Sequence, residues 1–266
     1  MFSLPTLAGR FPFRIGTTSY IVPADMETNV RVLADKVDDV ELLFFESHEV
    51  GALPSRETIR TLGEVAYFEE LSFTVHLPLD CRLGHLDAAE REKSADKCRR
   101  IVDLTAPLEP FAYVLHLYWD GDETALFDEA CRLQDRLVGT LSKTILRALD
   151  PARLCIENLA YPFEWVTPVA ETLGLSFCLD VGHIFVGGYP LDEYLDRYLS
   201  RARVVHLHGV QGVRDHRAVS CLPDDILKQI YSRLSSDTSY DRVVTLEVFN
   251  EKDLKASAFA MESLIR

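Results

Sequence analysis

The sequence lacks an excess of basic charge and any long hydrophobic run. Its 266 residues contain 28 lysines and arginines against 42 aspartates and glutamates, which gives a formal net charge of −14. A nucleic-acid groove needs a basic surface, and an anionic membrane surface also attracts basic segments. No apolar stretch reaches the length of a transmembrane helix. The composition therefore argues against both nucleic-acid and membrane partners.

Paired cysteines are also lacking. None of the six cysteines forms a Cys-x-x-Cys pair, which is the spacing typical of many zinc and redox motifs. Several cysteines lie in helix-like or strand-like patterns, so we interpret them as reduced packing residues. The first residues do not combine a basic start with a long apolar stretch, and no signal peptide is expected. We therefore expect a cytoplasmic protein.

Strand-like and helix-like segments alternate along the chain, and no linker or low-complexity segment divides them. Most strand candidates are nearly continuous apolar runs, which are typical of parallel strands covered by helices. Strands are expected at residues 13–20, 39–46, 72–78, 112–118, 153–159, 175–183, 204–210 and 243–249. Helices are expected near residues 27–36, 55–69, 87–105, 126–149, 163–173, 191–200, 223–234 and 252–265.

Eight alternating units predict an α/β fold in which residues 1–266 form a single (β/α)8 TIM barrel. An open, doubly wound sheet is the alternative. Neither a Gly-x-Gly-x-x-Gly motif after the first strand nor a Walker-type phosphate loop occurs in the sequence. Nucleotide-binding versions of the open sheet therefore lose support.

Histidines and carboxylates recur at the ends of the apolar runs. Five of the 8 histidines lie within them, and burying an imidazole or a carboxylate among apolar side chains is costly unless another group compensates it. The residues in question are Glu46, His76, His116, Glu157, Asp180, His206 and Glu247. In a parallel barrel all carboxyl strand ends open onto one face, so we expect a shared metal site there. The alternative is that each is a separately satisfied polar residue.

The expected order of the strands suggests which residues share an ion. Strands five to eight supply Glu157, Asp180, His206 and Glu247. Three carboxylates and one imidazole suit Mn²⁺, Zn²⁺ or Mg²⁺. A second ion could bind two imidazoles from neighbouring strands and share one carboxylate, using His76, His116 and Glu157. A third could bind residues that follow strands six and seven, namely His183, Asp215 and His216. We therefore expect divalent ions, Zn²⁺ or Mn²⁺, up to three per chain.

Further residues of the expected strand ends and top-face loops are candidate substrate contacts. They are Thr17, Thr18, Ser19, Tyr20, Glu46, Tyr118, Trp119, Phe163, His208 and Arg217. Hydroxyl groups and an arginine suit a phosphate, and aromatic walls suit a large, partly apolar ligand. Strand-end capping and simple cover of the barrel rim remain alternatives. His206 and His208 point to the same side of one strand; we predict that the deeper His206 is the ligand and that His208 lies at the rim.

Taken in chain order, the candidate ligands resemble those of the xylose isomerase-like barrel superfamily, which includes sugar isomerases, epimerases and abasic-site nucleases of the endonuclease IV type. The motif Asp180-Val-Gly-His183, with the histidines and glutamates around it, is similar to the trinuclear zinc pattern of these nucleases. One feature departs from it: the nucleases have Asp-x-His after strand seven, whereas Asp215 and His216 are adjacent. The departure puts the third ion, or Asp215 as its ligand, in question.

Residues 14–46 resemble the start of the cobamide-remodelling phosphodiesterases, a branch of the same superfamily. This resemblance implies hydrolysis of the phosphoester that links the nucleotide loop of a cobamide to the corrinoid side chain. The products would be cobinamide phosphate and an α-riboside.

Four functions compete at this point. The first, which is our prediction, is metal-dependent phosphodiester hydrolysis, in which metal ions activate water and stabilise the leaving oxygen. The second is a sugar or sugar-phosphate isomerase or epimerase with one ion and a Glu157/Glu247 acid–base pair. Abasic-site DNA cleavage conflicts with the charge of −14, and a non-catalytic binding protein would leave the polar cluster without a role. The expected partner is therefore a small molecule, either a corrinoid or a sugar phosphate.

Overall fold

The structure is a computed structural model, and it describes residues 4–44, 53–118, 127–212, 214–237 and 241–265. Within these ranges, eight parallel strands close into a barrel in the order β1-β10-β7-β6-β5-β4-β3-β2. Their bounds are β1 Arg14–Thr18, β2 Asp39–Leu43, β3 Ser72–His76, β4 Ala112–Leu115, β5 Leu154–Glu157, β6 Ser176–Asp180, β7 Ala202–Leu207 and β10 Val243–Leu246. The predicted TIM barrel is confirmed, and the open sheet is excluded.

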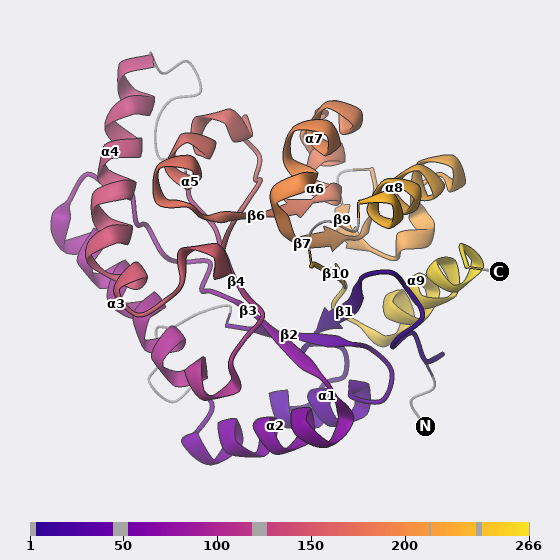
Figure 1. Cartoon of the computed structure of the whole chain (residues 1–266). Helices are drawn as coiled ribbons and strands as arrows, with labels where there is room; N and C mark the ends of the chain where they lie inside the picture. Colours follow the sequence, from indigo (N-terminus) through magenta and orange to yellow (C-terminus); the bar gives the residue numbers. More distant parts are fainter. Residues whose placement is uncertain (1–3, 45–52, 119–126, 213, 238–240, 266) are drawn as a thin grey trace.

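Helices form a layer outside the barrel (Figure 1). They are α1 Met26–Leu33, α2 Arg56–Glu69, α3 Ala88–Thr105, α4 Phe127–Lys143, α5 Thr167–Leu173, α6 Val181–Val186, α7 Leu191–Tyr198, α8 Asp224–Ser236 and α9 Glu251–Ser263. Short 3₁₀ turns occupy Ala106–Leu108, Ile145–Arg147, Pro151–Arg153, Phe163–Trp165, Leu199–Arg201 and Val219–Cys221. Among the described residues, no helix is both long and apolar enough to cross a membrane.

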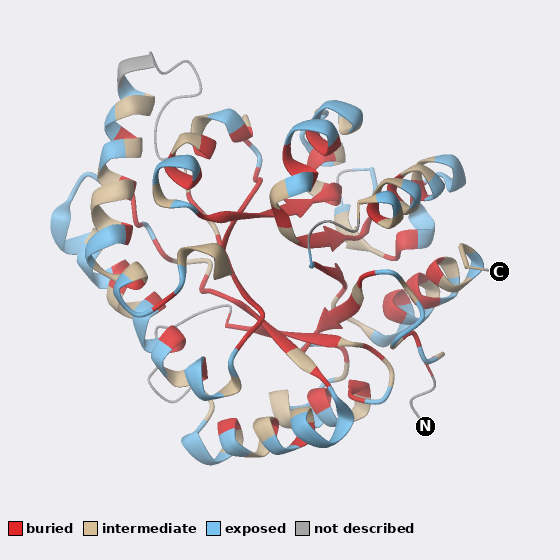
Figure 2. Cartoon of the chain, viewed as in Figure 1, coloured by how far each residue is buried: buried red, intermediate tan, exposed pale blue. Residues whose placement is uncertain are grey.

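The helices are amphipathic, and α2 shows how the sequence produces this. Ile59, Leu62 and Val65 recur at helical spacing and are buried against the barrel. Ser55 caps the start, because its side chain accepts a hydrogen bond from the backbone N–H of Thr58. Figure 2 shows the same arrangement around the ring, with exposed residues on the outer helix surfaces and buried residues along the strands.

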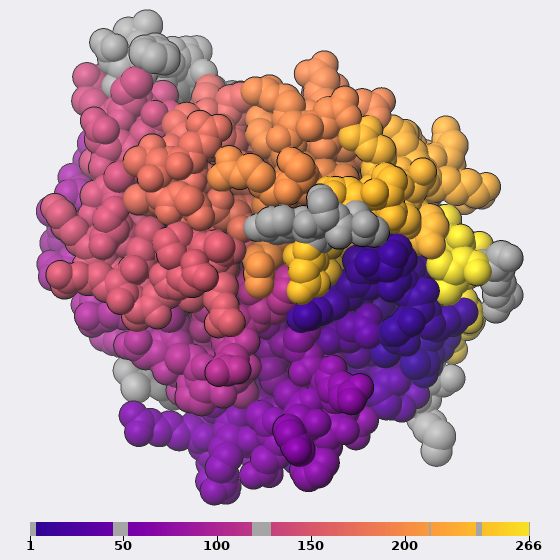
Figure 3. Space-filling view, in the orientation of Figure 1, coloured from indigo at the N-terminus to yellow at the C-terminus, as the bar shows by residue number. Residues whose placement is uncertain are grey.

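The chain closes on itself in sequence order. In the space-filling view, colours run around the ring from indigo to yellow, so that the first and last elements meet (Figure 3). This contact is the parallel pairing of β1 with β10, in which Ile15 is level with Val244 and Thr17 with Leu246. The closed sheet brings the ends of distant strands to one pole of the barrel.

A small apolar cluster fills the barrel interior below that pole. It is separate from the main core between strands and helices and consists of Phe111, Ala112, Val114, Cys155, Cys178, Val204 and Val243. Side chains on a strand alternate between its two faces, so residues two positions further along face the interior as well. After Val114, Cys155, Cys178 and Val204, those residues are His116, Glu157, Asp180 and His206. The strands therefore direct these polar side chains into one space at their carboxyl ends.

The expected strands end two or three residues earlier in the structure than their sequence patterns indicated. The expected strand at 175–183 stops at Asp180, and α6 begins at the next residue. The expected strand at 204–210 is divided between β7 and a hairpin made of β8 Gly209–Gln211 and β9 Arg214–Arg217. This hairpin was not predicted. The expected strand at 39–46 ends at Leu43 in β2, and Glu46 lies outside the described residues.

Candidate metal centre

Glu157 stands at the centre of the polar cluster. Its side chain is 1% exposed and comes from the last residue of β5. The Oε2 atom of Glu157 lies 2.8 Å from Nε2 of His116 and 3.4 Å from Nε2 of His76. Its other oxygen, Oε1, lies 3.4 Å from Nδ1 of His206. Three imidazoles from β3, the end of β4 and β7 therefore surround one buried carboxylate.

The ring of His76 is oriented by its own strand end. Its Nδ1 atom is 2.9 Å from the backbone oxygen of Leu77 and donates a hydrogen bond to it. Because Nδ1 is used in this bond, Nε2 is the nitrogen that faces Glu157, and it would be the one to bind a metal ion in the neutral ring. Donor atoms of His76, His116 and Glu157 lie within 4.8 Å of one another and could hold an ion.

A second donor group adds three more residues to Glu157. Asp180, His206 and Glu247 offer ligand atoms that lie, with one of Glu157, within 4.8 Å of one another. Nδ1 of His206 is 3.2 Å from Oε2 of Glu247 and 3.8 Å from Oδ2 of Asp180. Both Nδ1 of His206 and Oε2 of Glu247 are buried and make no hydrogen bond to the described residues. Buried polar atoms without partners are costly, and a divalent cation between them would satisfy both.

A third donor group lies beside the second and shares Asp180 with it. It consists of Asp180, His183, His208 and His216. Nε2 of His208 is 3.2 Å from Oδ2 of Asp180, and the rings of His208 and His216 stack at 4.3 Å. His216 comes from the hairpin strand β9, where its φ of 51° turns the backbone into the left-handed region. The unpredicted hairpin thus delivers a residue that the sequence had assigned to a loop.

Asp215 is placed differently from the prediction. Its Oδ1 atom lies 3.0 Å from Nδ1 of His216, on the far side of that ring from Glu247, whose Oε2 atom is 3.3 Å from Nε2 of His216. The Asp215 side chain is 40% exposed and belongs to none of the donor groups found among the described residues. In this structure the carboxylate of Asp215 contacts the outer nitrogen of the His216 ring and does not join the donor atoms.

His208 is also placed differently from the prediction, because it is not at the rim. Its ring is wholly buried under the hairpin, and Nδ1 accepts a hydrogen bond from the backbone N–H of His216. Gly182 makes room for the ring: a Cβ atom at this position would lie 1.8 Å from Cε1 of His208. The close approach of α6 to β7 therefore depends on glycine in the motif Asp180-Val-Gly-His183.

Asp180 is fixed by two local interactions. Its Oδ1 atom accepts a hydrogen bond of 2.6 Å from the backbone N–H of His183, so the same carboxyl group caps α6 and faces the donor groups. The side-chain amide of Asn158 bonds both the backbone N–H and the backbone oxygen of Asp180. The end of β6 is therefore held rigidly next to the end of β5.

Electrostatic coupling within the cluster is strong. Burial disfavours the charged form of His76, but the hydrogen bond and charge of Glu157 outweigh it and raise the pKa of His76 to about 9. Burial is outweighed in the same way at His216, where the contact with Glu247 raises the pKa to about 9. For Glu157 and Glu247, burial opposes ionisation, yet the neighbouring imidazolium groups, His206 among them, hold the pKa well below its ordinary value. Without a metal, protons on the imidazoles thus provide the positive charge that a cation would supply.

Three residues predicted to contact a substrate use their hydroxyl groups in hydrogen bonds within the barrel. The buried hydroxyls of Thr17 and Thr18 donate hydrogen bonds to the backbone oxygens of Leu246 and Val248. They join β1 to β10, so the prediction that they contact a substrate is not supported by their placement. Ser19 accepts a hydrogen bond from a backbone N–H of β2 and is 5% exposed. These residues serve as strand-end caps, the alternative that the sequence left open.

Phe163 does not line the mouth of the barrel. Its ring is 0% exposed and lies 5.2 Å from the ring of Phe177 and 5.0 Å from that of Tyr198. This placement does not support the prediction of a substrate contact for Phe163. The 3₁₀ turn that carries it folds inward and places the ring in the aromatic core beneath α7.

The remaining predicted contacts differ in their surroundings. The hydroxyl of Tyr118 is 3.1 Å from Nδ1 of His116, and the guanidinium of Arg82 lies over the tyrosine ring at 4.1 Å. Arg217 pairs with Asp253 of α9 at 3.4 Å. Tyr20 is 55% exposed. Trp119, like Glu46, lies outside the described residues.

Sequence reasoning missed Glu41. This residue lies inside β2, is wholly buried, and places its Oε2 atom 2.9 Å from Nε2 of His206. One signal was available: Glu41 interrupts an apolar run, two residues after Asp39 and on the same face of the strand. The prediction instead assigned the acidic residue of this run to Glu46 at its end.

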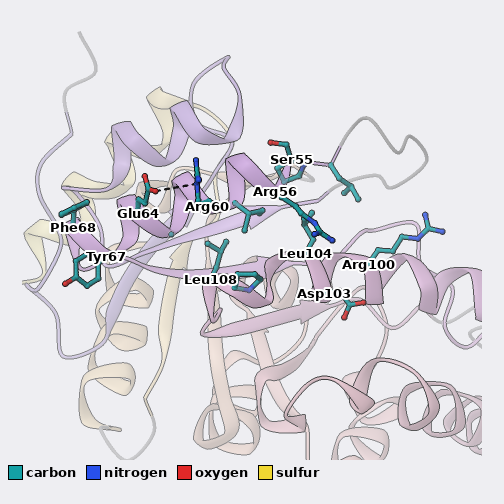
Figure 4. Close-up of a pocket in the computed structure, with 15 residues that line it drawn as sticks. Ser55, Arg56, Arg60, Glu64, Tyr67, Phe68, Arg100, Asp103, Leu104 and Leu108 are labelled. Atoms are coloured by element: carbon teal, nitrogen blue, oxygen red, sulfur yellow. Dashed lines mark ion pairs between the residues drawn. The ribbon is translucent and has the colours of Figure 1, made fainter.

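A surface groove lies away from the donor groups. It has a volume of about 1230 Å³ and is lined by residues of α2, α3 and the segments next to them, including Arg56, Tyr67, Arg100 and Leu108 (Figure 4). None of its lining residues belongs to a donor group. The groove is on the outside of the barrel and is not the candidate active site.

Comparison with known proteins identifies the class. Residues 33–265 match the family model described as xylose isomerase-like TIM barrel. The chain belongs to this family. Among curated protein sequences, none is significantly similar to the chain.

Solved structures similar to this chain include several sugar epimerases. A D-tagatose 3-epimerase-like protein has a TM-score of 0.73 at 18% identity, covering 95% of this chain and 97% of its own. The 3-keto-D-glucoside 4-epimerase YcjR from E. coli has a TM-score of 0.69 at 13% identity, covering 95% of this chain and 98% of its own. An L-ribulose 3-epimerase has a TM-score of 0.69 at 14% identity, covering 95% and 94%. At these identities the likeness shows the fold.

Proposed function

We propose that this protein is a metal-dependent isomerase or epimerase of sugars or sugar phosphates. The observation that carries the proposal is the donor group of Glu157, Asp180, His206 and Glu247, whose side chains are all buried and converge from four barrel strands or their ends. The unpartnered atoms in this group fit a divalent cation. A bound cation would act as a Lewis acid that polarises the carbonyl of the substrate.

Two glutamates would carry out the proton transfers. Glu157 and Glu247 approach the same nitrogen of His206 from different strands, at 3.4 and 3.2 Å. In the metal-free protein, burial opposes their ionisation but the neighbouring imidazoles outweigh it and hold the pKa of both glutamates below the ordinary range. Both are therefore carboxylates, which is the form that can accept a proton. One takes a proton from the carbon next to the carbonyl, and the other returns a proton to the intermediate. Solved structures with similar folds include sugar epimerases, which supports an isomerase or epimerase reaction.

Solvent isotope exchange tests the proposal. The protein, loaded with Mn²⁺, is incubated with ketoses and their phosphates in D₂O, and deuterium next to the carbonyl is measured by NMR. We expect exchange with at least one sugar, and loss of exchange of at least 100-fold in Glu157→Gln and in Glu247→Gln, as typical for removal of an acid–base group. Glu64→Gln is the matched control, because Glu64 is an exposed glutamate of α2 that belongs to none of the donor groups. Absence of exchange across a broad panel of sugars would refute the isomerase assignment.

A second candidate, hydrolysis of a phosphoester, is favoured by the remaining imidazoles. His76 and His116 complete one donor group around Glu157, and His183, His208 and His216 complete another around Asp180. An isomerase with one ion gives these five residues no required role. Clustered divalent ions, by contrast, stabilise both the attacking and the leaving oxygen in phosphoryl transfer. Of the phosphoesters, the nucleotide-loop ester of a cobamide is tested first, because residues 14–46 resemble the cobamide-remodelling enzymes.

The number of bound ions separates the two candidates. More than two equivalents of Zn²⁺ or Mn²⁺ per chain, reduced in His76→Ala or His116→Ala, would support hydrolysis. One equivalent that His116→Ala leaves unchanged would favour the isomerase. Incubation of the metal-loaded protein with a complete cobamide provides the direct assay. Formation of cobinamide phosphate would establish that the protein is a hydrolase. If there is no turnover, a cobamide is excluded as the substrate.

A further inference from the structure

A carboxylate lies beneath the donor groups and belongs to none of them. Glu41 comes from β2, which is three strands away from β7 around the barrel, and both Glu41 and His206 are 0% exposed. The Oε2 atom of Glu41 lies 2.9 Å from Nε2 of His206. This contact crosses the barrel interior and joins residues 165 positions apart in the sequence.

The buried carboxylate of Glu41 is only partly satisfied by hydrogen bonds. The second oxygen of Glu41, Oε1, is buried and makes no hydrogen bond to the described residues. The hydroxyls of Thr74 in β3 and Thr245 in β10 are also buried and have no hydrogen-bond partner among the described residues. A buried carboxylate with an unsatisfied oxygen destabilises a protein relative to an apolar side chain of similar size. Glu41 therefore stands where packing alone would favour an apolar residue.

The two nitrogens of His206 face different environments. Nε2 faces Glu41, whereas Nδ1 faces the carboxylates of Glu157, Asp180 and Glu247. A carboxylate next to one ring nitrogen keeps the proton there and leaves the lone pair of the other nitrogen for a metal ion. The same contact fixes the rotation of the ring.

We propose that Glu41 is a positioning residue for the metal centre. It accepts a hydrogen bond from Nε2–H of His206 and thereby directs the Nδ1 lone pair into the group formed with Glu157, Asp180 and Glu247. The inference rests on the metal-binding part of the proposed function, and it holds equally for an isomerase and for a hydrolase. Glu41 itself contacts neither the metal nor the substrate.

Direct metal binding tests this role without an activity assay. Metal-free protein is titrated with Co²⁺, with calorimetry for the dissociation constant and visible absorption for the ligand field. We expect Glu41→Leu to weaken the tightest Co²⁺ site by about 10- to 100-fold and to change its absorption spectrum, in line with removal of a carboxylate behind a metal-binding histidine. Glu41→Gln should change the constant by less than about fivefold, because its amide oxygen still accepts the Nε2–H bond.

The control is a carboxylate on the same strand. Asp39 is also 0% exposed and faces the interior, but its oxygens accept hydrogen bonds from Ser72 and from the backbone of Thr74. Asp39→Asn removes a buried charge near Glu41 without touching His206, and it should leave Co²⁺ affinity unchanged. If Glu41→Leu does not fold by circular dichroism, Glu41→Met, which matches the length of glutamate, takes its place.

The outcomes are distinct. Unchanged affinity and spectrum in the apolar Glu41 variant, or an equal loss in Asp39→Asn, overturns the positioning role while leaving the proposed function in place. A wild-type chain that binds neither Co²⁺ nor Mn²⁺ overturns the proposed function together with the inference. Weaker binding in the apolar variant with recovery in Glu41→Gln supports the role, because a general loss of packing would not be rescued by the amide.

Discussion

Raising the pH of the metal-free protein should destabilise it, because imidazolium groups balance the buried carboxylates. His76 provides the clearest case: it is 6% exposed and its pKa is raised to about 9 by Glu157, with smaller contributions from Glu41 and Glu247, against the opposing effect of burial. In the unfolded chain the same imidazole has its ordinary pKa of about 6.5. The folded state therefore binds this proton more tightly than the unfolded state does.

The sign and size of the effect follow from this difference. Because the folded pKa lies above the unfolded one, the contribution is complete below about pH 6.5 and is lost as the pH rises to about 9. Each pH unit in that window changes the free energy of unfolding by about 1.4 kcal/mol, so His76 alone contributes about 3 kcal/mol. For a chain of this size, that corresponds to a decrease in Tm of about 6 to 12 °C.

Urea unfolding at pH 6 and at pH 9.5, on metal-free and Mn²⁺-loaded protein, measures the effect. The loaded protein should lose less stability, because a divalent ion binds unprotonated imidazoles and is bound more tightly as the pH rises. In His76→Gln the pH-dependent loss of the metal-free protein should shrink by about 3 kcal/mol. A metal-free wild-type protein with equal unfolding free energies at the two pH values would refute the reasoning.

Three further predictions concern single residues. Phe163→Ala should lower the free energy of unfolding by about 3 to 5 kcal/mol, as for a core aromatic, and should leave the KM of the folded protein unchanged. A changed KM with an unchanged free energy of unfolding would instead show that Phe163 contacts the substrate. Gly182→Ala should displace the ring of His208, since its Cβ would lie 1.8 Å from Cε1, and metal analysis should show a loss relative to wild type. His216→Ala should also lower metal content, whereas Asp215→Asn should not, and equal losses in both would place Asp215 among the ligands.

Much of the barrel could be predicted from local pattern. Apolar runs separated by amphipathic segments are set by neighbouring residues, and a parallel barrel then dictates that strand ends meet. Glu157, Asp180 and His206 follow interior apolar residues by two positions, so the alternation of strand side chains placed them together. These predictions needed no knowledge of contacts between distant residues.

Other features depend on contacts that no local pattern encodes. Glu41 faces His206 across the barrel, and only the closed geometry reveals that the two meet. His208 resembled a rim residue because the hairpin that buries it could not be predicted from the short polar segment around Asp215. Phe163 resembled a loop aromatic, since the inward turn of its 3₁₀ segment depends on packing against Phe177.

Asp180, at the end of β6, uses one carboxyl group for two purposes, and this limits which amino acids can replace it. Oδ1 of Asp180 holds the first turn of α6 while the same side chain faces the donor groups, so most substitutions would damage folding and chemistry at once. Asparagine is the exception, because it caps helices as well as aspartate does but carries no negative charge. An Asp180→Asn chain should therefore keep its shape and lose its chemistry, and natural relatives that had abandoned catalysis while retaining the barrel would be expected to pass through that substitution first.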